Sequence, residues 1–152
     1  MMKQIPLVII DVQNGFTILN RERLALKVVK HIKLAKKREA PIVVLEYEGF
    51  QRTHSLILSE LEGYRNYVVL KKSESDGSYK TESILVEKWG LYAPLDIKVC
   101  GVYLTACVNS TVLGLMRKGF TVSVIAEACD NDGKDWQVEN WMKHNIKVVY
   151  NR

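Results

Sequence analysis

Short runs of apolar residues alternate with amphipathic stretches along almost the whole chain. The runs are rich in β-branched residues and contain few polar positions, which is typical of strands buried on both faces of a sheet. They predict six strands, at residues 5–10, 42–45, 67–70, 97–101, 121–126 and 146–150. Between them, apolar residues spaced three and four apart predict helices at residues 21–38, 54–61, 81–89, 107–118 and 135–144.

Strands that alternate with helices in this way predict a parallel sheet, covered on both sides by right-handed crossover connections. We therefore expect an α/β fold, a three-layer α/β/α sandwich with a six-stranded, mainly parallel, Rossmann-like sheet. The chain has 152 residues, and neither a repeat nor a linker divides it. Residues 1–152 are thus expected to form a single domain.

The composition is that of an ordinary globular protein, with 47% apolar residues, 26% charged residues and a net charge of +5. The densest basic cluster, residues 33–38, lies at the end of a predicted helix and lacks interleaved aromatic residues, so a nucleic-acid partner is not expected. No stretch approaches the ~20 apolar residues of a membrane span. Three cysteines without CxxC or zinc spacing fit a reducing compartment, and we expect a cytoplasmic protein.

Ligands of parallel α/β folds bind beyond the carboxyl ends of the strands. Asp11 follows the first strand there, and a turn that leads to Cys107 follows the fourth. Two adjacent lysines, Lys71 and Lys72, follow the third strand. A cysteine on the first turn of a helix faces unpaired N–H groups and the positive end of the helix dipole, and both favour the thiolate. The same cysteine also fits the core as a small apolar residue, so its position leaves both interpretations open.

A carboxylate, an ammonium group and a thiol at one sheet edge suit acyl transfer. A thiol that attacks a carbonyl needs a base, and Asp11 can serve if its surroundings raise its pKa. A lysine beside both groups would favour the thiolate and orient the carboxylate. Taken singly, the same residues also fit structural roles, as a turn or helix-capping aspartate and as solvated lysines.

The motifs around these residues resemble those of the isochorismatase-like cysteine hydrolases. Residues 7–16 are similar to the opening motif of that family, and residues 101–111 and 119–128 resemble its nucleophile turn, helix and next strand. The resemblance spans nearly the whole chain. It implies an isochorismatase-like hydrolase fold with an Asp-Lys-Cys triad, here Asp11, a lysine after the third strand, and Cys107.

The resemblance also bears on which lysine belongs to the triad. Adjacent residues on a strand point to opposite faces, so only one of the two can face the site. Short members of the family place an Asp-Gly-Ser turn a few residues beyond the catalytic lysine, and residues 76–78 form such a turn. This favours Lys72, with Lys71 as the alternative.

The family has a cis peptide after its Gly-Val pair, which corresponds to Val102–Tyr103 here. The resemblance implies an oxyanion hole at this turn, formed by the backbone N–H groups of Ala106 and Cys107. We further expect residues near the strand ends to contact substrate or to form the walls of its pocket: Gln13, Phe16, Tyr47, Tyr79 and Tyr103.

Nicotinamidases of this family carry an Asp-x-His…His metal site after the second strand. Residues 46–54 contain only His54, which we expect at the surface or at a helix start, so neither a metal nor a cofactor is expected. Leu104, Thr105 and Glu127 also depart from the usual residues of the family, which leaves the substrate open. The family implies a homo-oligomer, and the short chain favours a pocket completed by a neighbouring subunit.

Three hypotheses for function follow. We favour a cysteine hydrolase that cleaves a small amide or related acyl compound through a thioester on Cys107. The first alternative is vinyl-ether hydrolysis of an isochorismate-like substrate, with Asp11 as general acid. The second is a catalytically silent member of the family that acts in binding or assembly, which the intact triad positions disfavour.

Overall fold

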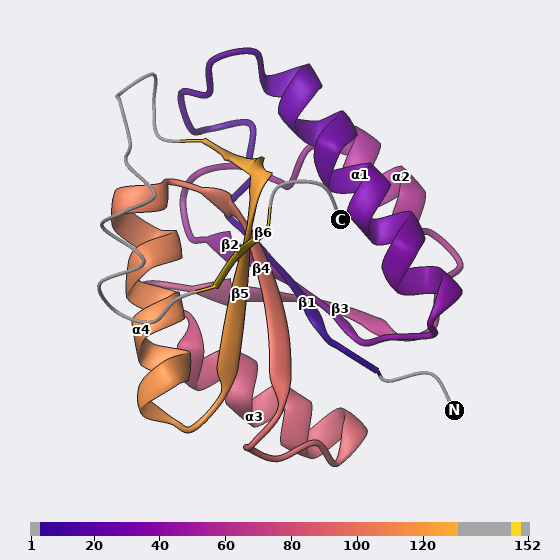
Figure 1. The fold of residues 1–152 in the computed structure, drawn as a ribbon. Coiled ribbons are helices and arrows are strands. Elements are labelled where there is room, and N and C mark those ends of the chain that lie inside the picture. The colour runs from indigo at the N-terminus through magenta and orange to yellow at the C-terminus, as the bar shows by residue number, and fades with distance from the viewer. Residues whose placement is uncertain (1–3, 131–146, 150–152) are drawn as a thin grey trace.

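A computed structural model describes residues 4–130 and 147–149, with side chains for the first of these ranges. Six strands form one sheet in the order β3-β2-β1-β4-β5-β6, and every neighbouring pair is parallel (Figure 1). The strands are β1 (Leu7–Ile10), β2 (Ile42–Tyr47), β3 (Tyr67–Lys72), β4 (Asp96–Val102), β5 (Thr121–Asp130) and β6 (Lys147–Val149). The predicted α/β fold is thereby confirmed.

Helices cover both faces of the sheet (Figure 1). On one face lie α1 (Arg21–Lys37) and α2 (Ser55–Leu61), and on the other lie α3 (Ser78–Trp89) and α4 (Asn109–Arg117). The helix predicted at residues 135–144 lies outside the described residues. No described helix has the length and apolar character that crossing a membrane requires.

The continuous apolar run of β1 results from this layering. Leu7 and Ile9 pack into the apolar cluster on the α1 side, whereas Val8 and Ile10 pack into the cluster on the α3 and α4 side. All four side chains are buried. Because successive side chains of a strand point to opposite faces, a strand with helices on both sides needs apolar residues at every position.

Three strands extend at least two residues beyond the carboxyl ends that their apolar runs predict. β2 continues to Tyr47, β3 to Lys72 and β5 to Asp130. The ladder between β2 and β3 runs through the pairs Glu46 with Lys71 and Tyr47 with Lys72. Backbone pairing thus continues past the first polar residue that follows each apolar run. Polar residues there ended the predicted strands too early.

The sequence predicted that a helix begins at Cys107, but in the structure Cys107 lies inside a helical turn. A short π-helical segment, η1 (Leu104–Val108), precedes α4. The N–H groups of Ala106 and Val108 both donate to the carbonyl oxygen of Tyr103, at 3.0 and 3.1 Å. The thiol is therefore held by a turn that starts three residues before it.

Candidate active site

Asp11, Lys72 and Cys107 come together at the carboxyl edge of the sheet. The Nζ of Lys72 donates to Oδ2 of Asp11 at 2.9 Å, and both side chains are buried. The thiol of Cys107 is only 6% exposed, and the Asp11 carboxyl acts on it through both charge and hydrogen bonding. Three residues that are 61 and 35 positions apart in sequence thus form one buried cluster.

The end of β1 aims the carboxyl of Asp11. Its residue adopts a positive φ of 55° immediately after the strand, while its backbone N–H still donates to the carbonyl oxygen of Leu45 at 3.0 Å. Left-handed backbone is uncommon for residues other than glycine, and aspartate is among those that tolerate it best. The chain thus turns at the residue that carries the buried carboxyl.

Lys72, and not Lys71, reaches the site. Lys71 is exposed, whereas the Lys72 side chain is 2% exposed. Its Nζ also donates to the carbonyl oxygen of Glu74 at 3.0 Å and lies 4.4 Å from the ring centroid of Tyr47. A carboxylate, a carbonyl oxygen and an aromatic face together compensate the burial of the ammonium group.

The surroundings of Asp11 and Cys107 raise the pKa of both groups. Burial raises the pKa of Asp11, with Lys72 acting in the opposite direction. Burial, followed by the charge of Asp11, raises the pKa of Cys107 to about 11, and Lys72 and Ser75 only partly offset this rise. At pH 7 a thiol of that pKa is ionised in roughly one molecule in ten thousand. Burial and the neighbouring carboxylate thus outweigh the lysine and the helix start, which by themselves favour the thiolate.

The second carboxyl oxygen of Asp11, Oδ1, is available as a hydrogen-bond acceptor. Oδ1 is buried and has no hydrogen-bond partner among the described residues. A buried carboxylate oxygen without a partner is costly, and such atoms in native proteins often serve a reaction. Asp11 thus holds Lys72 with one oxygen and keeps acceptor capacity for a proton or a ligand.

Aromatic side chains border this cluster, among them Phe16, Tyr47 and Tyr103. The rings of Phe16 and Phe50 are stacked, with their centroids 4.3 Å apart. Tyr47 and Tyr103 meet the Phe16 ring edge-on, at 6.4 and 5.6 Å. Phe50 was not predicted as a wall residue, and its only signal in the sequence is its position a few residues after the second strand. Since the Tyr47 ring also faces Lys72, these rings form an apolar wall next to the cluster.

Gln13 has a different role from the expected contact with substrate. Its side-chain nitrogen donates to the carbonyl oxygens of Tyr47 and Gln51, both at 2.9 Å, and its oxygen accepts from the N–H of Tyr47 at 2.7 Å. Both donor hydrogens of the amide are used on backbone. Gln13 therefore fixes the segment after β2, which carries the aromatic wall.

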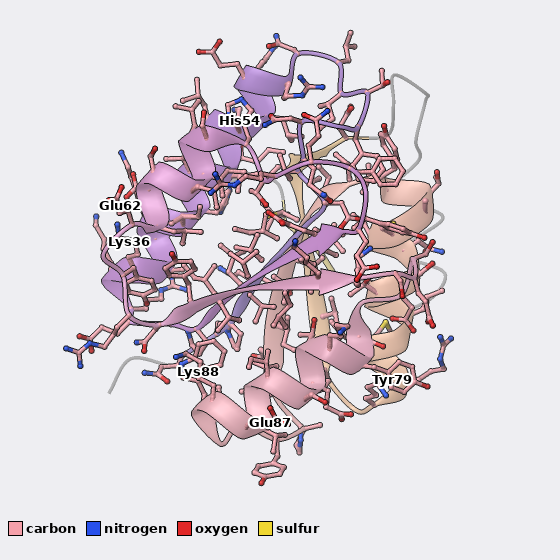
Figure 2. All side chains as sticks on the ribbon, turned by 180° about the vertical axis from the view of Figure 1, so that it is seen from behind. Lys36, His54, Glu62, Tyr79, Glu87 and Lys88 are labelled. Atoms are coloured by element: carbon pink, nitrogen blue, oxygen red, sulfur yellow. The ribbon has the colours of Figure 1, made fainter. Side chains whose placement is uncertain are left out.

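The expectation for Tyr79 is wrong. Its side chain is 66% exposed and projects from α3 at the outer surface of the molecule (Figure 2). Its ring packs against Lys118, whose Nζ lies 3.6 Å from the ring centroid. Tyr79 is the second residue of α3, and the rotation of that helix turns it away from the triad cluster.

The polar side chains at the end of β2 and in the segment after it form hydrogen bonds within that segment. Glu46 Oε2 accepts from the N–H and the hydroxyl of Thr53, at 2.8 and 2.7 Å. His54 lies at the start of α2, as predicted, where its Nδ1 accepts from the N–H of Leu56 at 3.1 Å (Figure 2). Across residues 4–130, no three His, Cys, Asp or Glu side chains are grouped so as to hold a metal ion.

The turn between β4 and η1 carries the implied cis peptide. The bond between Val102 and Tyr103 is cis. Gly101 precedes it with φ of 125°, and a Cβ there would lie 2.0 Å from the carbonyl oxygen of Ile10, so only glycine fits. The N–H of Ala106 already donates to Tyr103, which weakens its expected role as an oxyanion donor.

Comparisons with known proteins match both the sequence and the fold of this chain. The family model described as "Isochorismatase domain" matches residues 6–149. Isochorismatase domain-containing protein 2 of Xenopus laevis is 29% identical over 103 residues, which are 66% of this chain and 46% of that protein. The chain thus spans about half the length of the curated relative it matches.

Solved structures share the fold at low sequence identity. A nicotinamidase from Staphylococcus aureus superposes with a TM-score of 0.82 at 18% identity, covering 99% of this chain and 100% of the other. An N-carbamoylsarcosine amidase from Thermoplasma acidophilum gives 0.75 at 14% identity, covering 97% and 96%.

Proposed function

The chain belongs to the isochorismatase family of hydrolases, and on this premise we propose that it is a cysteine hydrolase. It cleaves a small amide or related acyl compound through a thioester on Cys107. The observation that carries the proposal is the buried ion pair of Asp11 and Lys72 beside the Cys107 thiol. An ion pair this deeply buried contributes little to stability, so its presence beside a thiol favours a role in chemistry.

In the first half-reaction, Asp11 takes the thiol proton while the sulfur attacks the substrate carbonyl. The raised pKa of Asp11 suits it to this task, because a carboxylate of raised pKa takes up a proton more readily than an ordinary one. The thiol is protonated at rest, so proton transfer accompanies the attack instead of preceding it. Asp11 then returns the proton to the departing amine, the C–N bond breaks, and the acyl group remains on Cys107 as a thioester.

In the second half-reaction, water attacks the thioester with Asp11 again as the base. The C–S bond breaks, the carboxylic acid leaves, and the thiol regains its proton. The ammonium group of Lys72 lies beside both groups and stabilises the negative charge that passes between carboxylate and sulfur. Backbone N–H groups of η1, among which we propose that of Cys107, stabilise the oxyanion.

The chemistry of the surroundings supports a small, flat substrate. The rings of Phe16, Tyr47 and Tyr103 present apolar surface beside one charged cluster. The structural neighbours include a nicotinamidase and an N-carbamoylsarcosine amidase, and both names denote enzymes that cleave small amides. We therefore propose nicotinamide-like and carbamoyl compounds as the first substrates to test.

The test is a panel of amides that contains nicotinamide and N-carbamoylsarcosine, with release of ammonia as the readout. Cys107→Ala is expected to lower turnover at least ~10³-fold without changing the fold, because the nucleophile is lost. Cys129→Ala is the matched control, since it removes a cysteine outside the cluster and should retain turnover. A Cys107→Ala variant with the wild-type rate would refute the mechanism, and wild-type protein inactive on every amide would refute the amide proposal.

One observation favours a second candidate. The raised pKa of Asp11 also suits a carboxylic acid that donates a proton, as vinyl-ether hydrolysis of an isochorismate-like compound requires. That reaction needs no nucleophilic sulfur. If Cys107→Ala retains vinyl-ether hydrolysis while Asp11→Asn abolishes it, the second candidate replaces the first.

A further inference from the structure

The loop of residues 73–77, between β3 and α3, contacts two members of the triad cluster. The carbonyl oxygen of Glu74 accepts from Nζ of Lys72 at 3.0 Å. The hydroxyl of Ser75 forms a hydrogen bond with the thiol of Cys107. The position of this loop thus determines where the lysine and one polar neighbour of the thiol lie.

The loop also packs closely on the aliphatic stem of the lysine. A Cβ at Gly77 would lie 3.3 Å from Cδ of Lys72 and 2.4 Å from Cδ1 of Leu45. Side-chain-free backbone therefore passes directly over the buried lysine. A displacement of the loop by even one ångström would change the surroundings of the ammonium group.

Thr111 ties this loop to the helix of the nucleophile. Its side chain is completely buried, one helical turn beyond Cys107. Oγ1 accepts from the N–H of Gly77 at 2.9 Å and donates to the carbonyl oxygen of Ser75 at 3.4 Å. One hydroxyl thus holds the loop at two points, and loss of the buried acceptor would leave the Gly77 N–H unpaired.

We propose that Thr111 is a positioning residue, which locks the 73–77 loop against α4 and so places Lys72 and Ser75 beside the sulfur of Cys107. The proposal rests on the proposed hydrolase function for its catalytic meaning. It assigns a role to a residue that does not touch the substrate and acts only through the loop. The charged groups that face the thiol are Asp11, just after β1, and Lys72 from β3, and Glu46 from β2 acts on Asp11.

The test compares Thr111→Val, which keeps the volume and removes the hydroxyl, with Thr111→Ser, which keeps the hydroxyl. With any amide that the wild type cleaves, Thr111→Val is expected to lower kcat ~10- to 100-fold and leave KM within about threefold. Thr111→Ser should restore kcat to within about threefold of the wild type. Loss of activity in both variants, or in neither, overturns the proposal.

A second readout does not depend on turnover. The rate at which iodoacetamide alkylates Cys107 at pH 9 reports its thiolate fraction. It should fall at least ~3-fold in Thr111→Val, because Lys72 and Ser75 both favour the ionised thiol, and recover in Thr111→Ser. An unchanged or faster rate in Thr111→Val overturns the proposal, even if the wild type cleaves no amide and the proposed function itself has failed.

Two further variants guard against a general loss of folding. Tyr64→Phe is the matched control, since it also removes only a hydroxyl, and that hydroxyl donates to the carbonyl oxygen of Ala40, outside the 73–77 loop, at 2.6 Å. It should keep the wild-type alkylation rate. If Thr111→Val does not fold, Ser75→Ala alters an exposed residue and should slow alkylation in the same direction. A wild-type rate in Ser75→Ala then overturns the proposal.

Discussion

Replacement of Asp11 by asparagine should make the Cys107 thiol more reactive toward alkylation, although it abolishes catalysis. The carboxylate raises the pKa of the thiol by charge and by hydrogen bonding, and the substitution removes the charge. The variant keeps a side chain of nearly the same size, so burial is largely unchanged. The sign of the effect therefore isolates the electrostatic contact between the two residues.

The magnitude follows from the pKa of about 11 for Cys107, against the ordinary value of 9.0. At pH 8 about one thiol in a thousand is ionised, compared with about one in ten for an ordinary cysteine, a difference of roughly a hundredfold. Burial causes the largest part of this rise and the Asp11 carboxyl the next, so Asp11→Asn should be alkylated ~3- to 30-fold faster at pH 8, short of the full hundredfold.

The assay is alkylation by iodoacetamide between pH 7 and 10, quantified on the peptide that contains Cys107. Peptides with Cys100 and Cys129 serve as internal controls, because burial raises the pKa of both thiols. The wild-type rate should rise about tenfold per pH unit up to pH 10 without a plateau. A plateau near pH 8 would refute the protonated resting thiol, and equal rates in wild type and Asp11→Asn would refute its contact with Asp11.

Lys72→Met should lower the free energy of unfolding at pH 7 by about 3 kcal/mol, because it leaves a buried carboxylate without its partner, whereas Lys71→Met should change it by less than about 0.5 kcal/mol. Urea denaturation measures both, and equal effects would contradict the assigned lysine. Gln13→Leu should cost about 2–3 kcal/mol in the same assay, because three hydrogen bonds to backbone are lost; a loss below about 0.5 kcal/mol would contradict its structural role. Burial lowers the pKa of His31, and its hydrogen bond helps to lower the pKa of Glu127, so the native state binds fewer protons than the unfolded state and stability should fall as the pH drops from 7 to 4. His31→Gln should reduce this dependence between pH 7 and 5, and an unchanged slope would count against the buried pair.

The fold could be predicted from sequence because its strands carry an unambiguous signal. A strand such as β1, buried on both faces, has no polar position, and its alternation with amphipathic helices leaves few other topologies. The same logic placed Asp11 at the sheet edge, since it follows the first apolar run directly. The choice between Lys71 and Lys72 needed the Asp-Gly-Ser turn, and that turn lies against the stem of Lys72.

Other features depend on three-dimensional packing that no spacing encodes. A polar side chain at a sheet edge can form hydrogen bonds with a substrate or with the backbone, and the amide of Gln13 bonds the backbone. The direction of Tyr79 depends on the rotation of α3 about its axis. The pKa of Cys107 depends most on burial, which raises it by more than the neighbouring lysine lowers it. The sequence shows the lysine and the helix start but not the burial. The sequence therefore predicted which residues meet at the site better than it predicted their pKa values.

The central claim is that Cys107 becomes acylated by an amide substrate, and rapid-quench mass spectrometry on the first turnover tests it most directly. Wild-type protein should gain the mass of the acyl group on the peptide that contains Cys107 before product accumulates. Asp11→Asn should show no such adduct, because its base is lost, and Cys129→Ala should show it unchanged. Steady release of ammonia by wild-type protein with no acyl adduct at any quench time, together with turnover by Cys107→Ala, would contradict the account.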